Sequence, residues 1–297
     1  METPSDKQPM QGKVCLVTGG TSGIGKVAAT ALASQGAEVV ITGRNPQKTR
    51  DCAEGIQAET GNDSVQYLLV DYSDLHQVTK LAAAFKNRYS HLDVLLNNAG
   101  TYCNTRIRTD YGVEKTFLVN HLAPFLLTNL LLDVIRSSAP ARIVNVASAA
   151  HHFATLNFDD LGFEHGYFGF SAYARSKLAN ILFTYELARR LEGSGVTVNA
   201  VHPGHVATNI WNNDLSIFGP VIKLINRLIA ITPQQGADTL IYLASSPDVA
   251  QVTGKYFIKR KAVSSSALSR DKNAARKLWE VCEKLVLLAE NPDNFTN

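Results

Sequence analysis

The chain has 297 residues, of which 45% are hydrophobic and 19% charged, and its formal net charge is +3 at pH 7. This composition is typical of a globular protein with one large or two small domains and enough apolar material for a sizeable core. The charge is small for this length and forms no basic stripe, so nucleic acid is not expected as a partner.

The N-terminal segment and the cysteines indicate the compartment. Residues 1–12 are polar, so we expect a flexible N-terminus without a signal peptide or membrane anchor. The sequence has no run of about 18 apolar residues, which argues against a spanning helix. Cys15, Cys52, Cys103 and Cys282 show no CxxC spacing and no histidine at metal-ligand spacing. We therefore expect reduced thiols, no metal site, and a soluble cytoplasmic protein.

Short β-branched runs alternate with longer helical stretches from residue 13 onward. Strands are predicted at 14–20, 38–44, 65–71, 92–100, 141–148, 196–204 and 255–259. Helices are predicted at 26–36, 46–60, 75–89 and 113–137, with another beginning at 171. Apolar strands separated by helices indicate a parallel sheet covered on both faces. The prediction is a single α/β, doubly wound domain over 13–260, with a seven-stranded, mostly parallel sheet that binds ligands at the carboxyl ends of its strands.

The last part of the chain, residues 261–297, differs in character. A serine-rich link leads into one helix whose apolar residues keep roughly helical spacing. These apolar residues are Leu278, Val281, Cys282, Leu285, Val286 and Leu288. We interpret this part as a C-terminal extension whose helix packs on the domain, with a partner-binding helix as the alternative.

A glycine-rich turn, TGGTSGIG at 18–25, lies between the first strand and the first helix. Such a turn allows the backbone to approach a pyrophosphate and directs a helix N-terminus at its charge. Any tight turn between strand and helix needs glycine, so the turn alone is a weak indication, and its spacing is GxxxGxG rather than GxGxxG. The predicted phosphate-binding residues are Gly19, Thr21, Ser22, Gly23, Ile24 and Gly25.

The ends of the next strands indicate which cofactor binds. An NAD site usually places an acidic residue after the second strand, to accept hydrogen bonds from the ribose 2′-OH. Arg44 stands there instead, and it can pair with a 2′-phosphate, so we expect NADP(H). A solvated surface arginine is the alternative. The other predicted contacts are Asp71, toward the adenine amino group, Tyr72, Asn98, Ala99 and Gly100.

Tyr173 and Lys177 lie four residues apart, so on a helix they share a face. Alone, such a pair can equally be a feature of the helix surface. A tyrosine can protonate a carbonyl oxygen as hydride reaches the carbon, but its ordinary pKa of about 10 is high for neutral pH. Lys177 is expected to lower that pKa through its charge. Ser148, at the end of a strand, is expected to hydrogen-bond the substrate oxygen.

Taken together, the motifs resemble those of the short-chain dehydrogenase/reductase family. They are TGGTSGIG, NNAG at 97–100, Asn120, Ser148, Tyr173-x-x-x-Lys177 and HPGHVATNI at 202–210. Stretches such as AYARSKLANILF look like the retinol dehydrogenase subgroup and its soluble and bacterial relatives. The resemblance implies a Rossmann-type domain that transfers hydride between NADP(H) and a carbonyl or alcohol, in class EC 1.1.1.-.

The resemblance also implies roles for individual residues. Lys177 would hold the nicotinamide ribose, and Asn120 would hold a water that relays protons to Lys177. Pro203, Gly204, Val206 and Thr208 would contact the cofactor. Many relatives are dimers or tetramers, so the resemblance implies a homodimer or tetramer unless the C-terminal extension alters the usual interfaces.

Two segments are candidates for selecting the substrate. The aromatic-rich insertion 149–172 can wall an apolar pocket, with His151, Phe153 and Phe168 as contacts, or simply pack onto the domain.

The segment 209–233 follows HPG, where the family places a mobile lid, and offers Ile210 and Trp211 as contacts. Peripheral membrane contact through the same apolar face is an alternative. Both segments favour a bulky, apolar, retinal-like aldehyde or ketone. The remaining alternative to an enzyme is an NADP(H)-binding sensor or scaffold, against which the intact catalytic set argues.

Overall fold

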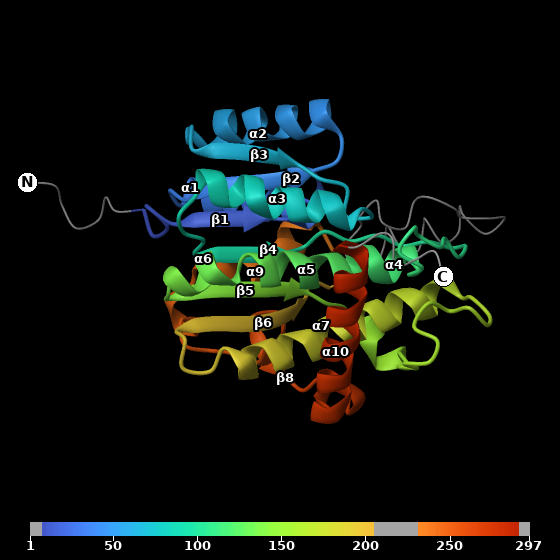
Figure 1. The fold of residues 1–297 in the computed structure, drawn as a ribbon. Coiled ribbons are helices and arrows are strands. Elements are labelled where there is room, and N and C mark those ends of the chain that lie inside the picture. Colours follow the sequence, from blue (N-terminus) through green and yellow to red (C-terminus); the bar gives the residue numbers. More distant parts are fainter. Residues whose placement is uncertain (1–7, 205–230, 291–297) are drawn as a thin grey trace, which may run out of the picture.

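The computed structural model describes residues 8–204 and 231–290, with an eight-stranded sheet between two layers of helices (Figure 1). The strands are β1 (Val14–Val17), β2 (Glu38–Gly43), β3 (Val65–Leu69), β4 (Val94–Asn97), β5 (Ala141–Val146), β6 (Val196–His202), β7 (Lys255–Ile258) and β8 (Lys261–Val263). Their order is β3-β2-β1-β4-β5-β6-β7-β8, and β1 to β7 are parallel. The α/β doubly wound prediction is therefore confirmed.

The prediction of seven strands is one short. The eighth strand, β8, lies within the segment interpreted as the C-terminal extension and pairs antiparallel with β7. Lys259 and Arg260, which join the two strands, have φ angles of 49° and 60°. Two consecutive positive φ values are typical of a type I′ hairpin turn, which usually contains Asn or Gly. The Lys-Arg pair lacks that sequence signature, which is why the hairpin was not predicted.

The helices cover both faces of the sheet. They are α1 (Gly23–Ser34), α2 (Pro46–Thr60), α3 (Leu75–Arg88), α4 (Lys115–Phe117), α5 (Ala123–Leu130), α6 (Leu132–Ser137), α7 (Gly169–Arg190), α9 (Pro233–Ser245) and α10 (Lys272–Glu290). Residues of β1 alternate between two cores: Cys15 and Val17 pack with α1, α2 and α9, while Val14 and Leu16 pack with α3, α5 and α7. Helix α10 packs across the outside of α7 (Figure 1).

The long helix predicted over 113–137 is interrupted. After α4 the chain forms a π-helical turn at Leu118–Leu122, and α5 and α6 then follow as separate helices. Pro124 supplies a reason, because it has no N–H to bond the carbonyl of Asn120 in α-helical register. A wider turn relieves that mismatch, and π turns often mark functional sites. Here the turn contains Asn120 and His121, both buried.

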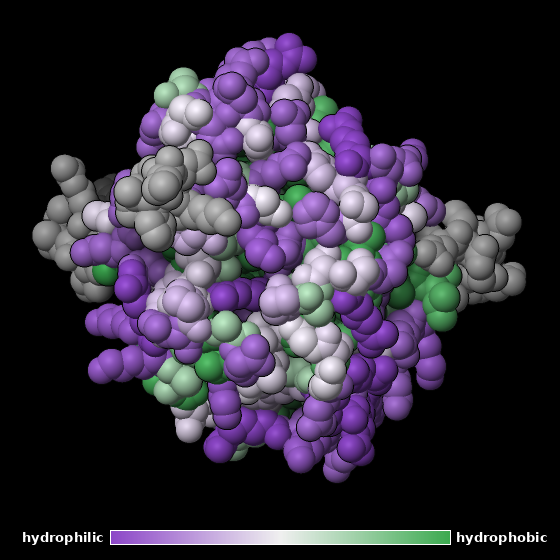
Figure 2. Space-filling view, turned by 90° about the vertical axis from the view of Figure 1, so that its left-hand side faces the viewer, coloured by the Kyte–Doolittle hydropathy of each residue, from purple (hydrophilic) through white to green (hydrophobic). Residues whose placement is uncertain are grey.

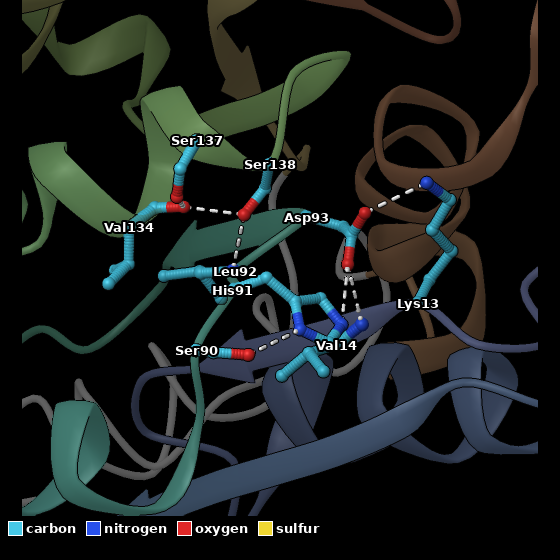
Figure 3. A network of polar contacts seen from close by, with 9 residues as sticks. All are labelled: Lys13, Val14, Ser90, His91, Leu92, Asp93, Val134, Ser137 and Ser138. Atoms are coloured by element: carbon cyan, nitrogen blue, oxygen red, sulfur yellow. Dashed lines mark hydrogen bonds and ion pairs between the residues drawn. The ribbon is translucent and has the colours of Figure 1, made fainter.

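A polar cluster joins strands at the amino-terminal edge of the sheet (Figure 3). Asp93 directly precedes β4 and is 5% exposed. Its carboxylate accepts hydrogen bonds from the Val14 N–H at 2.9 Å and from Lys13 Nζ at 2.8 Å, while His91 Nε2 lies 3.7 Å away. These contacts connect β1 to β4 at the edge opposite the carboxyl ends of the parallel strands, which indicates a structural role.

Some predicted features lie outside the described residues. They are Val206, Thr208, Ile210, Trp211 and the segment 209–233 up to residue 230. Over residues 8–204 and 231–290, no helix combines the length and apolar character needed to cross a membrane.

Candidate active site

A cleft of about 620 Å³ lies at the carboxyl ends of the parallel strands. The predicted residues that line it are Gly19, Thr21, Ser22, Gly23, Ile24, Arg44, Asp71, Tyr72, Asn98, Ala99, Gly100, Ser148, Tyr173, Lys177, Pro203 and Gly204. Further lining residues that were not predicted include Thr42, Val70, Thr101, Lys115, Val119, Val146, His202 and Pro233. The opposite end of the molecule, seen in Figure 2, presents a mostly hydrophilic surface.

The glycine turn is built by close backbone packing. A Cβ at Gly19, where φ is 64°, would lie 3.0 Å from Ala99 Cα. Thr18 Oγ1 accepts hydrogen bonds from the N–H groups of Asn98 and Ala99 at 2.8 and 3.0 Å. These contacts fix the turn after β1 against the NNAG segment after β4. Gly25 does not line the cleft but permits this packing, since a Cβ there would lie 2.4 Å from Asn98 Nδ2.

The N-terminus of α1 opens on the same cleft. Ser22 is its N-cap residue but makes no side-chain capping hydrogen bond. A helix start leaves backbone N–H groups that an intrahelical partner does not satisfy, and these favour an anion. The turn and helix start therefore have the geometry of a phosphate-binding site.

Charged residues surround the far end of the cleft. Burial tends to raise the pKa of Asp71, but hydrogen bonds from Ser73 and the charges of Arg44 and Lys115 bring it below its ordinary value. Arg44 is exposed on the rim. Tyr72 forms part of the floor, where its hydroxyl is 2.9 Å from Thr42 Oγ1 and burial raises its pKa. An anionic group with an adjacent polar ring would fit this end.

Ser148, Tyr173 and Lys177 meet at the other end of the cleft. Tyr173 lies within α7, and Ser148 lies two residues beyond the end of β5. Burial raises the pKa of Tyr173 to about 12, and a hydrogen bond with Ser148 acts in the opposite direction. Burial therefore sets the net direction, and the expected lowering by the Lys177 charge stays a prediction. The raised value keeps the tyrosine protonated, as a proton donor must be.

Lys177 is 4% exposed and reaches the cleft from one turn further along α7. Its Nζ donates a hydrogen bond to the Val146 carbonyl at 3.2 Å and lies 5.5 Å from the centre of the Tyr173 ring. Burial lowers its pKa to about 8. A Cβ at Gly100 would lie 3.3 Å from Asn120 Oδ1 and 3.7 Å from this Nζ, so only the contact with Asn120 would be tight.

Asn120 lies behind these residues rather than on the cleft wall. Its Oδ1 accepts a hydrogen bond from the Thr101 N–H at 2.6 Å. Its Nδ2 donates to the Thr101 carbonyl and to Ser176 Oγ, each at 3.0 Å. The side chain thus links the segment after β4 to α7, which leaves the backbone of Asn120 for the water relay that the family resemblance implies.

The insertion 149–172 does not bring its predicted substrate residues to the cleft. His151 is 1% exposed, with Nδ1 at 2.6 Å from the Ser148 carbonyl and Nε2 accepting the Ser266 N–H at 3.1 Å. Both ring nitrogens are engaged, so His151 packs the insertion onto the domain. Phe153 and Phe168 are 74% and 65% exposed and are not among the cleft residues.

Two other aromatic residues pack with Tyr173, although neither lines the cleft. Tyr102 packs edge-on against Tyr173, with ring centres 6.0 Å apart, and Phe170 contacts the same cluster. No periodic pattern surrounds Tyr102 in the sequence, and only its place after the NNAG segment could have indicated that it belongs to the site.

The sheet order, the glycine turn and the Ser-Tyr-Lys arrangement define a Rossmann-type short-chain dehydrogenase/reductase. A model of the short chain dehydrogenase family matches residues 13–216, and the chain belongs to this family. Within it, the chain is similar to human retinol dehydrogenase 14, with 41% identity over 93% of this chain and 87% of that protein. Human retinol dehydrogenase 11 is 42% identical over 94% and 87% of the two chains.

Comparison with solved structures supports the same family. An uncharacterized protein from Mycobacterium paratuberculosis superposes with a TM-score of 0.77 and 31% identity, over 96% of this chain and 97% of that one. A chain described as a short chain dehydrogenase from Escherichia coli, solved with NADPH, gives a TM-score of 0.67 and 25% identity over 86% and 100%. The protein is therefore an oxidoreductase of the retinol dehydrogenase-like subgroup, a class that acts on CH–OH groups and carbonyls.

Proposed function

We propose that the protein is an NADP(H)-dependent reductase of bulky, apolar aldehydes or ketones, with Tyr173 as the acid. The observation that supports this most directly is that Ser148, Tyr173 and Lys177 line one end of a cleft whose other end has a phosphate turn and Arg44. Such a cleft fits a long dinucleotide with an anion at its far end and a reacting group between the three side chains.

The residues present fit NADP(H). The α1 N-terminus and the turn at Gly19 suit the pyrophosphate, since a side chain at Gly19 would meet Ala99. Arg44 suits the 2′-phosphate, with Lys115 as a second cation near Asp71. When bound, NADPH supplies the hydride that reduces the carbonyl carbon.

The chain's own groups act at the carbonyl oxygen. Ser148 orients that oxygen by a hydrogen bond and stabilises the negative charge that develops on it. The Tyr173 O–H gives its proton to the oxygen, which becomes the alcohol hydroxyl, and a tyrosinate is left. The Lys177 ammonium stabilises that tyrosinate. A water held at the Asn120 backbone then supplies a proton that passes through Lys177 to the tyrosinate, which restores the Tyr173 O–H. Alcohol oxidation follows the same path in reverse.

The substrate class follows from the surroundings and from similarity. Tyr102 and Phe170 pack in one apolar cluster with Tyr173, although neither lines the cleft, and apolar surroundings of the acid favour an apolar substrate. The similar human proteins bear the name retinol dehydrogenase, so retinal is the first compound to test. We also propose residues 13–260 as the catalytic domain, with 261–297 as its extension. The protein would act in the cytoplasm as a homodimer or tetramer.

The test is NADPH consumption with a panel of retinal, steroid, lipid and aromatic carbonyls. Wild type should reduce at least one member, and Tyr173→Phe should lose activity by at least about 100-fold, within the range for a general acid. NADPH should bind more tightly than NADH, and Arg44→Ala should remove that preference. Full activity in Tyr173→Phe would disprove the acid. NADPH binding without turnover of any compound would favour the sensor alternative.

A further inference from the structure

A chain of buried hydrogen bonds leads from the C-terminal helix to the catalytic lysine. Lys177 Nζ and Asn180 Nδ2 both donate to the Val146 carbonyl, at 3.2 and 3.1 Å. Asn180 Oδ1 lies 3.0 Å from His121 Nδ1, and His121 Nε2 lies 3.4 Å from Cys282 Sγ. The chain thus joins β5, α7, the π turn and α10, through side chains that are each less than 5% exposed.

The direction of every bond in this chain is determined. A carbonyl only accepts, so the group of Asn180 that faces Val146 is its NH₂ and the group that faces His121 is its oxygen. His121 must therefore carry its proton on Nδ1, which leaves Nε2 to accept the Cys282 S–H. Burial lowers the pKa of His121 to about 4 and raises that of Cys282, so the imidazole is neutral and the thiol protonated.

The surroundings hold His121 in place. Its ring packs against Phe117, Phe125 and Phe183, with ring centres 5.1, 6.4 and 6.1 Å away. Asn120, the preceding residue in the π turn, bonds to Ser176 Oγ. Consecutive residues of that turn therefore contact α7 at Ser176 and Asn180, on either side of Lys177 in the sequence.

We propose that His121 and Asn180 are positioning residues for Lys177, and that Cys282 of α10 completes their hydrogen-bond chain. The Val146 carbonyl is the one backbone acceptor found for Lys177 Nζ among the described residues. Asn180 holds the same peptide group by a second donor, and His121 fixes Asn180. The proposal rests on the proposed function, in which Lys177 acts at the reacting end of the cleft.

The first experiment compares NADPH binding, followed by fluorescence, in two backgrounds. His121→Leu and Asn180→Leu should each weaken binding about threefold to tenfold, the effect of one neutral hydrogen bond. In a Lys177→Met background the same changes should have no further effect, because they act through Lys177. His121→Asn, which keeps a donor near the position of Nδ1, should remain within about twofold of wild type. Glu186→Gln, at the far end of α7, is the control for helix destabilisation.

Equal losses of NADPH affinity in the wild-type and Lys177→Met backgrounds would overturn the proposal. So would a His121→Asn protein that binds NADPH as weakly as His121→Leu does. If His121→Leu does not fold, Cys282→Ala and Cys282→Ser offer a milder pair, of which only the alanine should weaken binding. Failure of the wild type to bind NADPH would refute the proposed function instead.

A second measurement does not depend on cofactor or turnover. The ¹⁵N spectrum of the His121 ring should show a neutral Nδ1–H tautomer at pH 6, and Cys282→Ala should shift the Nε2 resonance. An Nε2–H tautomer would overturn the hydrogen-bond chain directly.

Discussion

Two helical glycines, Gly25 in α1 and Gly55 in α2, give opposite predictions for the same substitution. Alanine exceeds glycine in helix propensity by about 1 kcal/mol. A Cβ at Gly55 would meet no atom within 4 Å, so Gly55→Ala should raise the free energy of unfolding by about 1 kcal/mol. For a chain of this size, that corresponds to a rise in Tm of about 2–4 °C.

At Gly25 the same methyl group has no space. It would lie 2.4 Å from Asn98 Nδ2 and 2.5 Å from the Gly19 carbonyl oxygen. Asn98 would have to leave the carbonyls of Thr18 and Gly19, to which its Nδ2 donates at 2.8 and 3.2 Å. The two lost hydrogen bonds cost about 2 kcal/mol and the overpacking about 1–3 kcal/mol, against about 1 kcal/mol of helix propensity. Gly25→Ala should therefore lower the free energy of unfolding by about 2–4 kcal/mol.

The assay is urea unfolding of both variants beside wild type, together with NADPH titration. Gly25→Ala should also weaken NADPH binding by at least about tenfold, because the displaced turn is the proposed phosphate site. Gly55→Ala should bind NADPH as wild type does. A Gly25→Ala protein with wild-type stability and wild-type binding would refute the packing argument, as would a destabilised Gly55→Ala.

Three further predictions concern stability and substrate binding. Arg175 is 5% exposed, donates hydrogen bonds to the carbonyls of Thr155 and Asp160, and stacks on Phe163. Arg175→Met should therefore speed hydrogen exchange over 155–161 and raise KM for the carbonyl substrate, while NADPH binding stays unchanged. Unchanged exchange would contradict that role. Asp93→Asn should lower the free energy of unfolding by about 1.5–3 kcal/mol, because Lys13 loses a buried charged partner. An unchanged free energy in urea unfolding would contradict this role of Asp93. The pKa of His121 lies at about 4 in the folded chain, against 6.5 when unperturbed, so the unfolded chain binds a proton that the folded chain excludes. Stability should fall by about 3 kcal/mol as pH drops through that window, and His121→Asn should flatten the slope.

Local patterns predicted most of the sheet and the helices over 46–60 and 75–89 with accuracy. The helix predicted over 46–60 is α2 with the same bounds, because Pro46 and the Asn45 cap mark its start and Gly61, in a left-handed conformation, ends it. The parallel strands followed from apolar runs between helices. Since the carboxyl ends of parallel strands meet at one edge, the residues after them were predicted to share a cleft, and they do.

Other features depended on contacts that no local pattern reports. The hairpin at Lys259 and Arg260 lacks the usual turn residues, and the π turn arises where Pro124 cannot bond Asn120. His151 and Phe153 were candidates for the substrate site by composition alone. The structure buries the first and exposes the second, because the path of the insertion is set by its packing on α7 and on the segment after β8.

The family, the glycine turn and the set of Ser148, Tyr173 and Lys177 could be predicted from local sequence, because each depends on neighbours within a few residues or on the end of a strand. The protonation of these side chains, in contrast, depends on tertiary packing. Burial, which raises the pKa of Tyr173 and lowers that of Lys177, is produced by the packing of the whole domain. The same holds for the contact of His121 with Cys282, 161 residues away, which exists only because α10 packs across α7.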